Sequence, residues 1–305
     1  MNPLDRYTFW YSRLANIRGV NKYFLTPFRK IVRALARRRI PEYFRNTPIP
    51  HNERKSDVIV SFTSFPARIN DVYLVVNCLL RQTVLPSKII LWLSKDQFEG
   101  ISLPENLLSL QNDIFQIRFV DGDIRSHKKY HYVLNEYPQD RILIVDDDQY
   151  YPTDMLEQML EASDQHPRSV ICRYGSVARY SAAGKILPYR QWWYEVSGPS
   201  DDQNFFFGSG GGTLLRRELL HPDVLDLDLA TALTPLADDV WLNAMVNLAG
   251  TTKHKVRFGL LLQTTDQTVR LTNENVGNDA NTAQIASICE HYESKGLAPF
   301  AYRTR

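Results

Sequence analysis

The sequence predicts an α/β protein with a mostly parallel sheet flanked by helices. Short apolar runs recur along the chain and stay apolar throughout, as in strands that are covered on both faces. Segments with the apolar spacing of helices separate these runs, and this alternation is typical of parallel sheets. With 305 residues, of which 44% are hydrophobic, the chain is long and apolar enough to bury a large core.

The first half of the chain alternates regularly between the two patterns. The predicted strands are residues 57–62 (DVIVSF), 88–93 (KIILWL), 115–120 (FQIRFV), 141–145 (RILIV) and 169–174 (SVICRY). The predicted helices are residues 69–82, 128–137 and 152–163. If the first four strands lie in the order 3-2-1-4, the first and fourth end side by side. Ligands bind at such reversals of strand order.

The second half of the chain is less regular. Residues 191–212 are predicted to form an aromatic- and glycine-rich loop, residues 238–250 a helix, and residues 255–263 a strand. We divide the chain into a basic helical arm with its linker, residues 1–55, and an α/β domain, residues 56–305.

Composition excludes several classes of protein. No apolar run approaches the roughly 20 residues that cross a bilayer, and the N-terminus lacks the features of a secretory signal. Cys78, Cys172 and Cys289 are far apart and odd in number, which favours a reducing compartment and gives no zinc-ligand spacing. These features predict a cytoplasmic protein.

The arm and the body carry opposite charge. Residues 1–55 hold 13 Lys/Arg and 3 Asp/Glu, whereas the remainder holds 23 and 31. Thr26 is predicted as the N-cap and Pro27 as the first residue of an arm helix. Phe28, Ile31, Val32 and Leu35 share one of its faces, with Arg29, Lys30, Arg33 and Arg37 on the other side.

This pattern predicts that residues 27–39 lie on an anionic membrane surface, peripherally associated with the inner face of the cell membrane. The alternative is a helix packed on the body with a solvated basic face. Nucleic acid is not expected as a partner, because the body has the wrong sign of charge.

Three adjacent carboxylates, Asp146, Asp147 and Asp148, follow the predicted fourth strand. In extended chain, Asp146 and Asp148 would point the same way, about 6.5–7 Å apart, with Asp147 opposite. Such a pair suits a hard divalent cation that is shared with phosphates. The alternative is a solvated acidic turn before a helix.

The segment ILIVDDDQYYP resembles the DxD motif of GT-A glycosyltransferases. Three further segments occur in the matching order: VSFTSFPARI, FFFGSGGGTLLRREL and LADDVWLNAMV. The whole is similar to bacterial polysaccharide and lipooligosaccharide glycosyltransferases, and more distantly to the exostosin-like hexosaminyltransferase domain. The resemblance implies a GT-A fold, with a nucleotide-binding half at about 56–150 and an acceptor-binding half at about 151–305.

The resemblance also implies roles for individual residues. Asp148 would hold Mn²⁺ or Mg²⁺ against the donor diphosphate, and Asp146 would contact the ribose or the donor sugar. The remaining residues implied in binding the nucleotide sugar are Thr63, Arg68, Lys128, Lys129 and Asp147. The implied reaction moves a sugar, in the first place from a UDP-sugar, to a glycan or lipid-linked acceptor in cell-surface polysaccharide synthesis.

Asp238 and Asp239 form the second acidic motif, and the resemblance implies that Asp239 foremost acts beside the anomeric carbon and the acceptor hydroxyl. A carboxylate there accepts a proton in an inverting reaction or stabilises positive charge in a retaining one; the exostosin-like resemblance favours retention. Acids at a helix start are also favoured without any catalytic role.

Two further pairs are candidates for the acceptor or donor-sugar loop. Gly210 and Gly211 permit close backbone approach to a ligand. Trp192 and Trp193 are candidates for stacking on a sugar, although aromatic pairs also occur in cores.

One departure from the resemblance concerns the C-terminal region. The histidine that many GT-A enzymes place near the diphosphate is absent, and Asn275, Asn278 and Asp279 are the candidate substitutes. His127, His131, His254 and His291 show no metal-ligand spacing. Two alternatives stay open: a nucleotidyltransferase, although no glycine follows the first strand, and a catalytically inactive sugar-binding relative.

Overall fold

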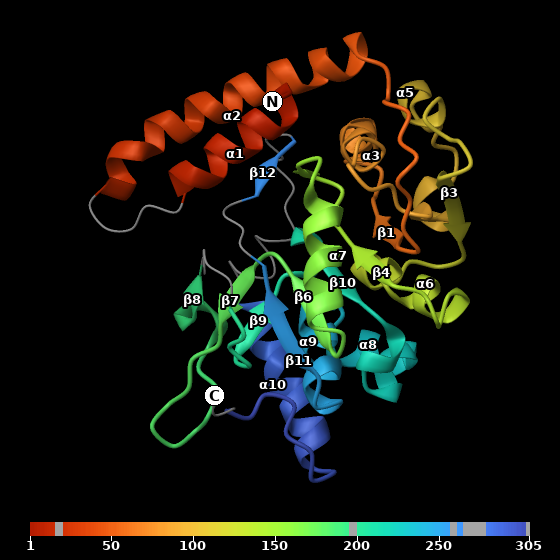
Figure 1. Ribbon diagram of the computed structural model, residues 1–305. Helices are drawn as coiled ribbons and strands as arrows, with labels where there is room; N and C mark the ends of the chain where they lie inside the picture. The colour runs from red at the N-terminus through yellow and green to blue at the C-terminus, as the bar shows by residue number, and fades with distance from the viewer. Residues whose placement is uncertain (16–20, 195–199, 257–260, 265–278, 303–305) are drawn as a thin grey trace.

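A seven-stranded sheet forms the centre of the protein (Figure 1). The computed structural model describes residues 1–15, 21–194, 200–256, 261–264 and 279–302. In spatial order the strands are β11 (Thr252–Lys255), β6 (Ser169–Cys172), β10 (Thr213–Leu215), β4 (Ile142–Ile144), β1 (Ile59–Thr63), β2 (Lys88–Ser94) and β3 (Phe115–Val120). All pairings are parallel except those of β10, which is antiparallel to both of its neighbours. The predicted α/β class is confirmed, and the sheet is consistent with a Rossmann-like fold.

The predicted strand order 3-2-1-4 is also confirmed, as β3-β2-β1-β4. Each of the five strands predicted in the first half lies within two residues of its predicted bounds. The helix predicted at 69–82 is shorter, α3 (Val72–Leu79), and a 3₁₀ turn precedes it. The helix predicted at 128–137 is likewise divided into the 3₁₀ helix η2 (Arg125–Lys129) and α6 (His131–Glu136).

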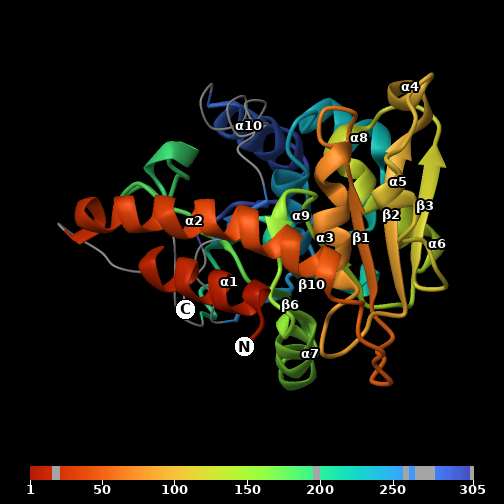
Figure 2. The ribbon, with the colours of Figure 1, turned by 90° about the horizontal axis from the view of Figure 1, so that it is seen from above.

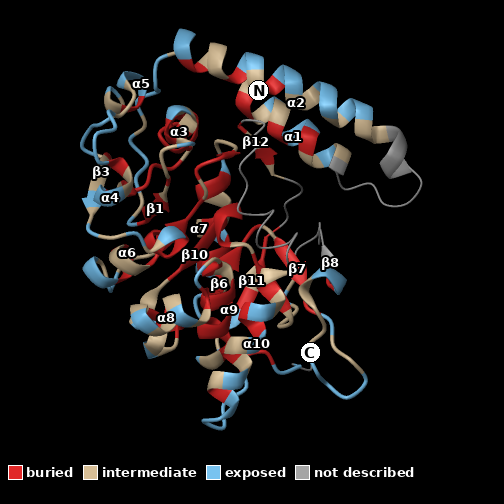
Figure 3. Cartoon of the chain, turned by 180° about the vertical axis from the view of Figure 1, so that it is seen from behind, coloured by how far each residue is buried: buried red, intermediate tan, exposed pale blue. Residues whose placement is uncertain are grey.

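Side chains alternate between the two faces of the sheet and build two cores, which run as buried residues along the strands in Figure 3. Val60, Phe62 and Leu143 point to the face covered by α3 and α7 (Met155–Gln165). Ile59 and Ile142 point to the opposite face, which is covered by α6, α9 (Asp238–Leu248) and α10 (Ala280–Glu293). Each fully buried aliphatic side chain contributes roughly 1.5–3 kcal/mol, so both faces stabilise the sheet.

The second half departs from the sequence prediction. The predicted loop at 191–212 contains β8 (Trp193–Tyr194) and β9 (Phe205–Phe207), which flank β7 (Gly175–Val177) in a small sheet. The single strand predicted at 255–263 is wrong: β11 ends at Lys255, and β12 (Leu262–Gln263) pairs instead with β5 (Gln149–Tyr150). Residues 257–260 between them lie outside the described residues. The remaining helices are α4 (Lys95–Phe98), α5 (Glu105–Leu108) and α8 (Leu227–Leu233).

The arm consists of two helices, α1 (Pro3–Ala15) and α2 (Asn21–Asn46), which lie side by side on one side of the molecule (Figures 1 and 2). The helix predicted to start at Thr26 starts instead at Asn21, so Thr26 is not an N-cap and Pro27 lies in the second turn. Within the described residues, no helix is both long and apolar enough to span a bilayer.

The arm packs on the body, as in the alternative interpretation of its sequence. Leu4, Ala36 and Ile40 are fully buried in the same core as the sheet. The Asp5 carboxylate accepts hydrogen bonds from the backbone N–H and the hydroxyl of Thr153, at 2.8 Å each. These contacts anchor the start of α1 and the second half of α2.

We therefore expect substitutions on α2 to separate into two classes. Ile40→Ala should lower the free energy of unfolding by about 2–4 kcal/mol, because it opens a cavity in the core. Leu35→Ala, on the exposed side of the same helix, should change it by less than about 0.5 kcal/mol. Urea unfolding measures both. Equal effects would mean that α2 does not share the core of the body.

Candidate functional site

A pocket of about 930 Å³ opens at the C-terminal ends of β1 and β4, where the strand order reverses. The two predicted strand-end segments, Thr63–Arg68 and Asp146–Asp148, both contribute to its lining. The opposite walls come from Gly210 and Gly211, from the start of α9, and from α2. The sequence therefore predicted the position of the pocket correctly from strand order alone.

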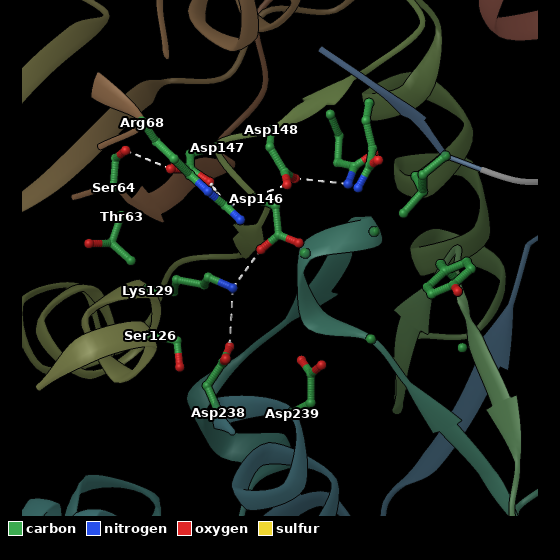
Figure 4. A pocket seen from close by; sticks show the side chains of 18 of the residues that line it. Thr63, Ser64, Arg68, Ser126, Lys129, Asp146, Asp147, Asp148, Asp238 and Asp239 are labelled. Carbon is green, nitrogen blue, oxygen red and sulfur yellow. Dashed lines mark hydrogen bonds and ion pairs between the residues drawn. The ribbon is translucent and has the colours of Figure 1, made fainter. Parts of the chain in front are cut away.

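The acidic triplet forms a tight turn between β4 and β5 rather than extended chain. The expected geometry, with Asp146 and Asp148 on one side and Asp147 on the other, is therefore wrong. The turn directs both Asp147 and Asp148 to Arg68. Arg68 Nη1 lies 2.7 Å from Asp147 Oδ1 and 3.3 Å from Asp148 Oδ2 (Figure 4). Ser64 Oγ donates a second hydrogen bond to Asp147, at 2.5 Å. Arg68 and Asp147, which were both expected to bind the nucleotide, bind each other here.

The triplet Asp146–Asp148 places three carboxyl groups close together, and two of them, Asp147 and Asp148, are buried. Burial raises the pKa of Asp148 to about 7, and the charges of Asp146 and Asp147 add to the rise, while Arg68 opposes it. Burial also raises the pKa of Asp147 despite its contacts with Arg68 and Ser64. Oxygen ligands crowded in this way match the preference of hard divalent cations. Asp148 and Asp146 are thus the residues that fit a Mg²⁺ or Mn²⁺ ion.

Lys129 connects the triplet to the second acidic motif. Its Nζ lies 2.6 Å from Asp146 Oδ1 and 3.5 Å from Asp238 Oδ2, between the two motifs in Figure 4. Burial alone would lower the pKa of Lys129, but the surrounding carboxylates raise it, so the ammonium group stays charged. Lys129 therefore binds the acidic residues of the protein itself, and it is not free to bind a diphosphate alone.

Asp238 and Asp239 lie in the first turn of α9 and are held by one serine. Ser209 Oγ donates to Asp238 Oδ2, and the backbone N–H of Ser209 donates to Asp239 Oδ1, both at 2.6 Å. Burial raises the pKa of Asp239 to about 7, with a further rise from the charge of Asp238, whereas Lys129 lowers it. Asp239 is thus poised to exchange a proton near neutral pH.

The glycines of the GSGGG segment are needed for the packing of the site itself. A Cβ atom on Gly210 would lie 1.8 Å from the carboxyl carbon of Asp146, and one on Gly211 would lie 2.4 Å from Tyr174 Cβ. The carbonyl oxygen of Gly210 also accepts a hydrogen bond from the backbone N–H of Asp146, at 3.2 Å. Glycine is therefore the residue that lets this loop approach the acidic triplet.

Other predicted site residues divide between the pocket and the core. Thr63 and Lys128 line the pocket, but the Thr63 hydroxyl donates to the Trp92 carbonyl and Lys128 pairs with Asp123. Trp192 is buried against Tyr189 and Phe206, with ring centroids 4.7 and 5.2 Å away, and it does not line the pocket. The expected sugar-stacking role of Trp192 is wrong in this structure, because Trp192 completes an aromatic core.

Three predicted positions fall wholly or partly outside the described part of the chain. The side chain of Trp193 lies there, as do Asn275 and Asn278. Asp279 precedes α10 and accepts a hydrogen bond from the Thr282 hydroxyl, at 2.6 Å. Asn281, two residues later, lines the pocket instead.

The pocket wall also contains a set of buried polar atoms that no sequence pattern predicted. Within the described residues, Ser126 Oγ, Gln149 Oε1, Ser176 Oγ and Asn281 Oδ1 have no hydrogen-bond partner, and all four residues line the pocket. A buried polar atom without a partner costs about 1–3 kcal/mol, so these atoms indicate a polar ligand. They come from four distant segments, and no pattern in the sequence connects them.

A second cluster of potential metal ligands, His166, Asp201 and His254, lies away from the pocket. It includes His254, for which the sequence shows no metal-ligand spacing. His254 Nδ1 lies 2.6 Å from Asp201 Oδ1, and the rings of His166 and His254 stack at 3.9 Å. The potential ligand atoms of these three residues lie within 4.8 Å of one another, close enough to hold a metal ion. No spacing in the sequence predicts this cluster, because β11 and the end of α7 become neighbours only in the folded protein.

The pocket thus brings together two acidic motifs, a buried lysine between them and unsatisfied polar atoms around them. This arrangement offers carboxylate oxygens to a cation, unsatisfied atoms to a polar ligand, and at Asp239 a carboxyl group that exchanges a proton near neutral pH. Neither a family model nor a curated protein matches the chain.

The electrostatics of the triplet predict an unusual effect of charge removal. Since the folded-state pKa of Asp148 lies above its usual value, stability should fall as pH rises from about 4 to 7. Asp148→Asn removes this penalty. Without divalent cations, we expect it to raise the free energy of unfolding at pH 8 by roughly 1–3 kcal/mol and at pH 5 by about a third as much.

Chemical denaturation at both pH values, with EDTA present, measures this effect. Asp113→Asn is the matched control, because Asp113 is exposed and should show no gain at either pH. A loss of stability in Asp148→Asn at pH 8 would mean that the folded protein favours the charged form of this residue.

Proposed function

We propose that the protein is a metal-dependent glycosyltransferase of the GT-A type. The observation that carries the proposal is the meeting of the Asp146–Asp148 turn and the Asp238–Asp239 helix start across Lys129, in one pocket at the switch point of the sheet. The resemblance of the triplet to a DxD motif supports the same assignment. The substrates proposed are a nucleotide-diphosphate sugar, in the first place a UDP-sugar, and a glycan or lipid-linked acceptor.

Asp148, with Asp146 beside it, is the proposed holder of Mn²⁺ or Mg²⁺. Such an ion, when bound, offsets the negative charge that develops on the departing diphosphate. Arg68 keeps Asp147 and Asp148 together in the turn. The uncharged wall of Thr63 and Ser126 is the proposed contact surface for the nucleoside.

Asp239 is the proposed catalytic residue. Its pKa near 7 lets the carboxylate accept a proton from an acceptor hydroxyl, if the reaction inverts. In a retaining reaction the same carboxylate would stabilise positive charge at the anomeric carbon. Ser209 fixes the orientation of the carboxylate through its backbone N–H. The unsatisfied oxygens of Ser176 and Asn281 are suited to sugar hydroxyl groups.

Calorimetric titration with UDP tests the proposal. We expect binding to strengthen by tenfold or more when Mn²⁺ is added, and Asp148→Asn to lose that dependence. Asp239→Asn should bind UDP as the wild type does but turn over a nucleotide sugar about 10²–10⁴ times more slowly. Asp113→Asn is the control for both. Failure of every common nucleoside diphosphate to bind would refute the proposal.

We further propose that the outward face of the arm binds an anionic membrane surface. Phe28, Ile31 and Leu35 of α2 are 58, 55 and 45% exposed, far more than large apolar side chains usually are. Arg38 and Arg39, also exposed, flank them on the helix surface. Trp10 of α1 is 53% exposed as well. Apolar side chains beside cations are typical of helices at lipid headgroups.

Point substitutions test this proposal better than deletion of the arm, which would remove core residues such as Leu4 and Ile40. Phe28→Gln with Ile31→Gln should weaken binding to anionic phosphatidylserine liposomes about tenfold or more, since two apolar side chains no longer insert. Ile101→Gln with Leu297→Gln alters two apolar side chains that are exposed elsewhere and should change nothing. Sedimentation with liposomes measures both, and equal binding by all three proteins would contradict the proposal.

A further inference from the structure

The inward side of α2 changes character along its length. Arg29, Arg33, Ala36, Ile40 and Phe44 follow one another at spacings of three and four residues, so they share one side of the helix. Ala36, Ile40 and Phe44 are buried in the core. The same side, one turn and more earlier, lines the pocket with Thr26, Arg29, Lys30 and Arg33. Arg29, Lys30 and Arg33 therefore face inward, over the pocket.

This arrangement is the inverse of the usual one. A helix on a globular protein normally turns its apolar side chains to the body and its charges to water. In the first half of α2, Phe28 and Ile31 face outward and Arg29 and Lys30 line the pocket. The pocket side of α2 is thus built for charge rather than for packing.

The cations of α2 that line the pocket are additional to the cations that pair with its carboxylates. Residues 21–41 hold seven Lys/Arg and no Asp/Glu. Five of the six carboxylates that line the pocket have cationic partners in the body: Arg68 binds Asp147 and Asp148, Lys129 binds Asp146 and Asp238, and Lys128 binds Asp123. The sixth, Asp239, accepts a hydrogen bond from the backbone N–H of Ser209.

Arg39 of α2 pairs with Glu42 of the same helix, whereas the contacts of Arg29 and Lys30 leave their positive charge in place. Within the described residues, Arg29 donates to the neutral Thr26 hydroxyl and Lys30 forms no ion pair. The positive charge of Arg29 and Lys30 is therefore available to an anion that enters the pocket.

We propose that Arg29 and Lys30 form a phosphate-binding subsite on the α2 wall of the pocket. Arginine binds phosphate oxygens through two parallel N–H donors, and lysine binds them as a point charge. The inference rests on the proposed function for the origin of the phosphate, which belongs either to the donor diphosphate or to a phosphorylated acceptor. Lys128 and Lys129, expected from the sequence to bind the diphosphate, are paired with carboxylates instead.

A pair of double variants tests the subsite. Arg29→Gln with Lys30→Gln removes two positive charges that line the pocket. Arg45→Gln with Lys55→Gln removes two charges from exposed positions that do not line it. Both variants should keep the circular dichroism spectrum and melting temperature of the wild type, because all four side chains lie outside the core.

Titration calorimetry with two pairs of probes locates the phosphate. The donor pair is UDP and uridine; the acceptor pair is farnesyl diphosphate and farnesol, at saturating UDP and Mg²⁺. Loss of Arg29 and Lys30 should raise the Kd of one diphosphate probe about tenfold and leave its phosphate-free counterpart within twofold. An effect on UDP assigns the subsite to the donor, and an effect on farnesyl diphosphate assigns it to the acceptor. The control variant should change neither.

Three results would overturn the subsite: no change with either diphosphate probe, an equal change in the control variant, or an equal change for uridine and farnesol. Failure of the proposed function has a different signature, since wild-type protein would then bind no nucleoside diphosphate. The subsite would in that case still be tested by farnesyl diphosphate without nucleotide.

Discussion

The contact on which the pocket depends is the buried ammonium group of Lys129. Lys129 follows β3 in the chain, and its ammonium group binds Asp146 at the end of β4 and Asp238 at the start of α9. Each of these loops carries more than one carboxylate, and like charges in a medium of low dielectric constant repel strongly. A buried cation between them converts that repulsion into attraction. Removing one charged partner from such a buried group lowers the free energy of unfolding far more than removing a surface ion pair does.

The close approach of the two acidic loops then dictates the residues around them. Ser209 supplies hydrogen bonds to both carboxylates at the start of α9, and Gly210 passes the Asp146 side chain at a distance that excludes any Cβ atom. Arg68 holds the far side of the triplet. The raised pKa values of Asp148 and Asp239 show that these contacts compensate burial only in part. Charge remains to be neutralised at both acidic motifs, which is the condition of a site that binds cations or protons.

Sequence reasoning found the parts of this site that lie on regular elements. The continuous apolar runs identified the strands, and their order brought Thr63–Arg68 beside the triplet. The prediction from sequence failed where contacts between distant segments determine the local structure. The three residues of β10 follow a glycine-rich turn, and their antiparallel pairing with β4 and β6 depends on tertiary contacts. The turn at Asp147 depends on Arg68 and Ser64, and the burial of Trp192 depends on Tyr189 and Phe206. Periodicity within one segment carries no information on such partners.

The orientation of the arm helix α2 was likewise not predictable from the sequence alone. Helical spacing correctly placed Phe28, Ile31 and Leu35 together on one side of α2. Val32, predicted on the same side, packs against the core instead, and the spacing did not show which side faces the body. The rule that apolar sides face inward rests on the free energy of burial, and so it applies only where a core lies beneath the helix. Ala36 and Ile40 lie over the core and obey the rule. Arg29 and Lys30 lie over a polar pocket, where an apolar side would gain little and a cation remains hydrated. One continuous helix therefore closes the core with its second half and lines the pocket with its first.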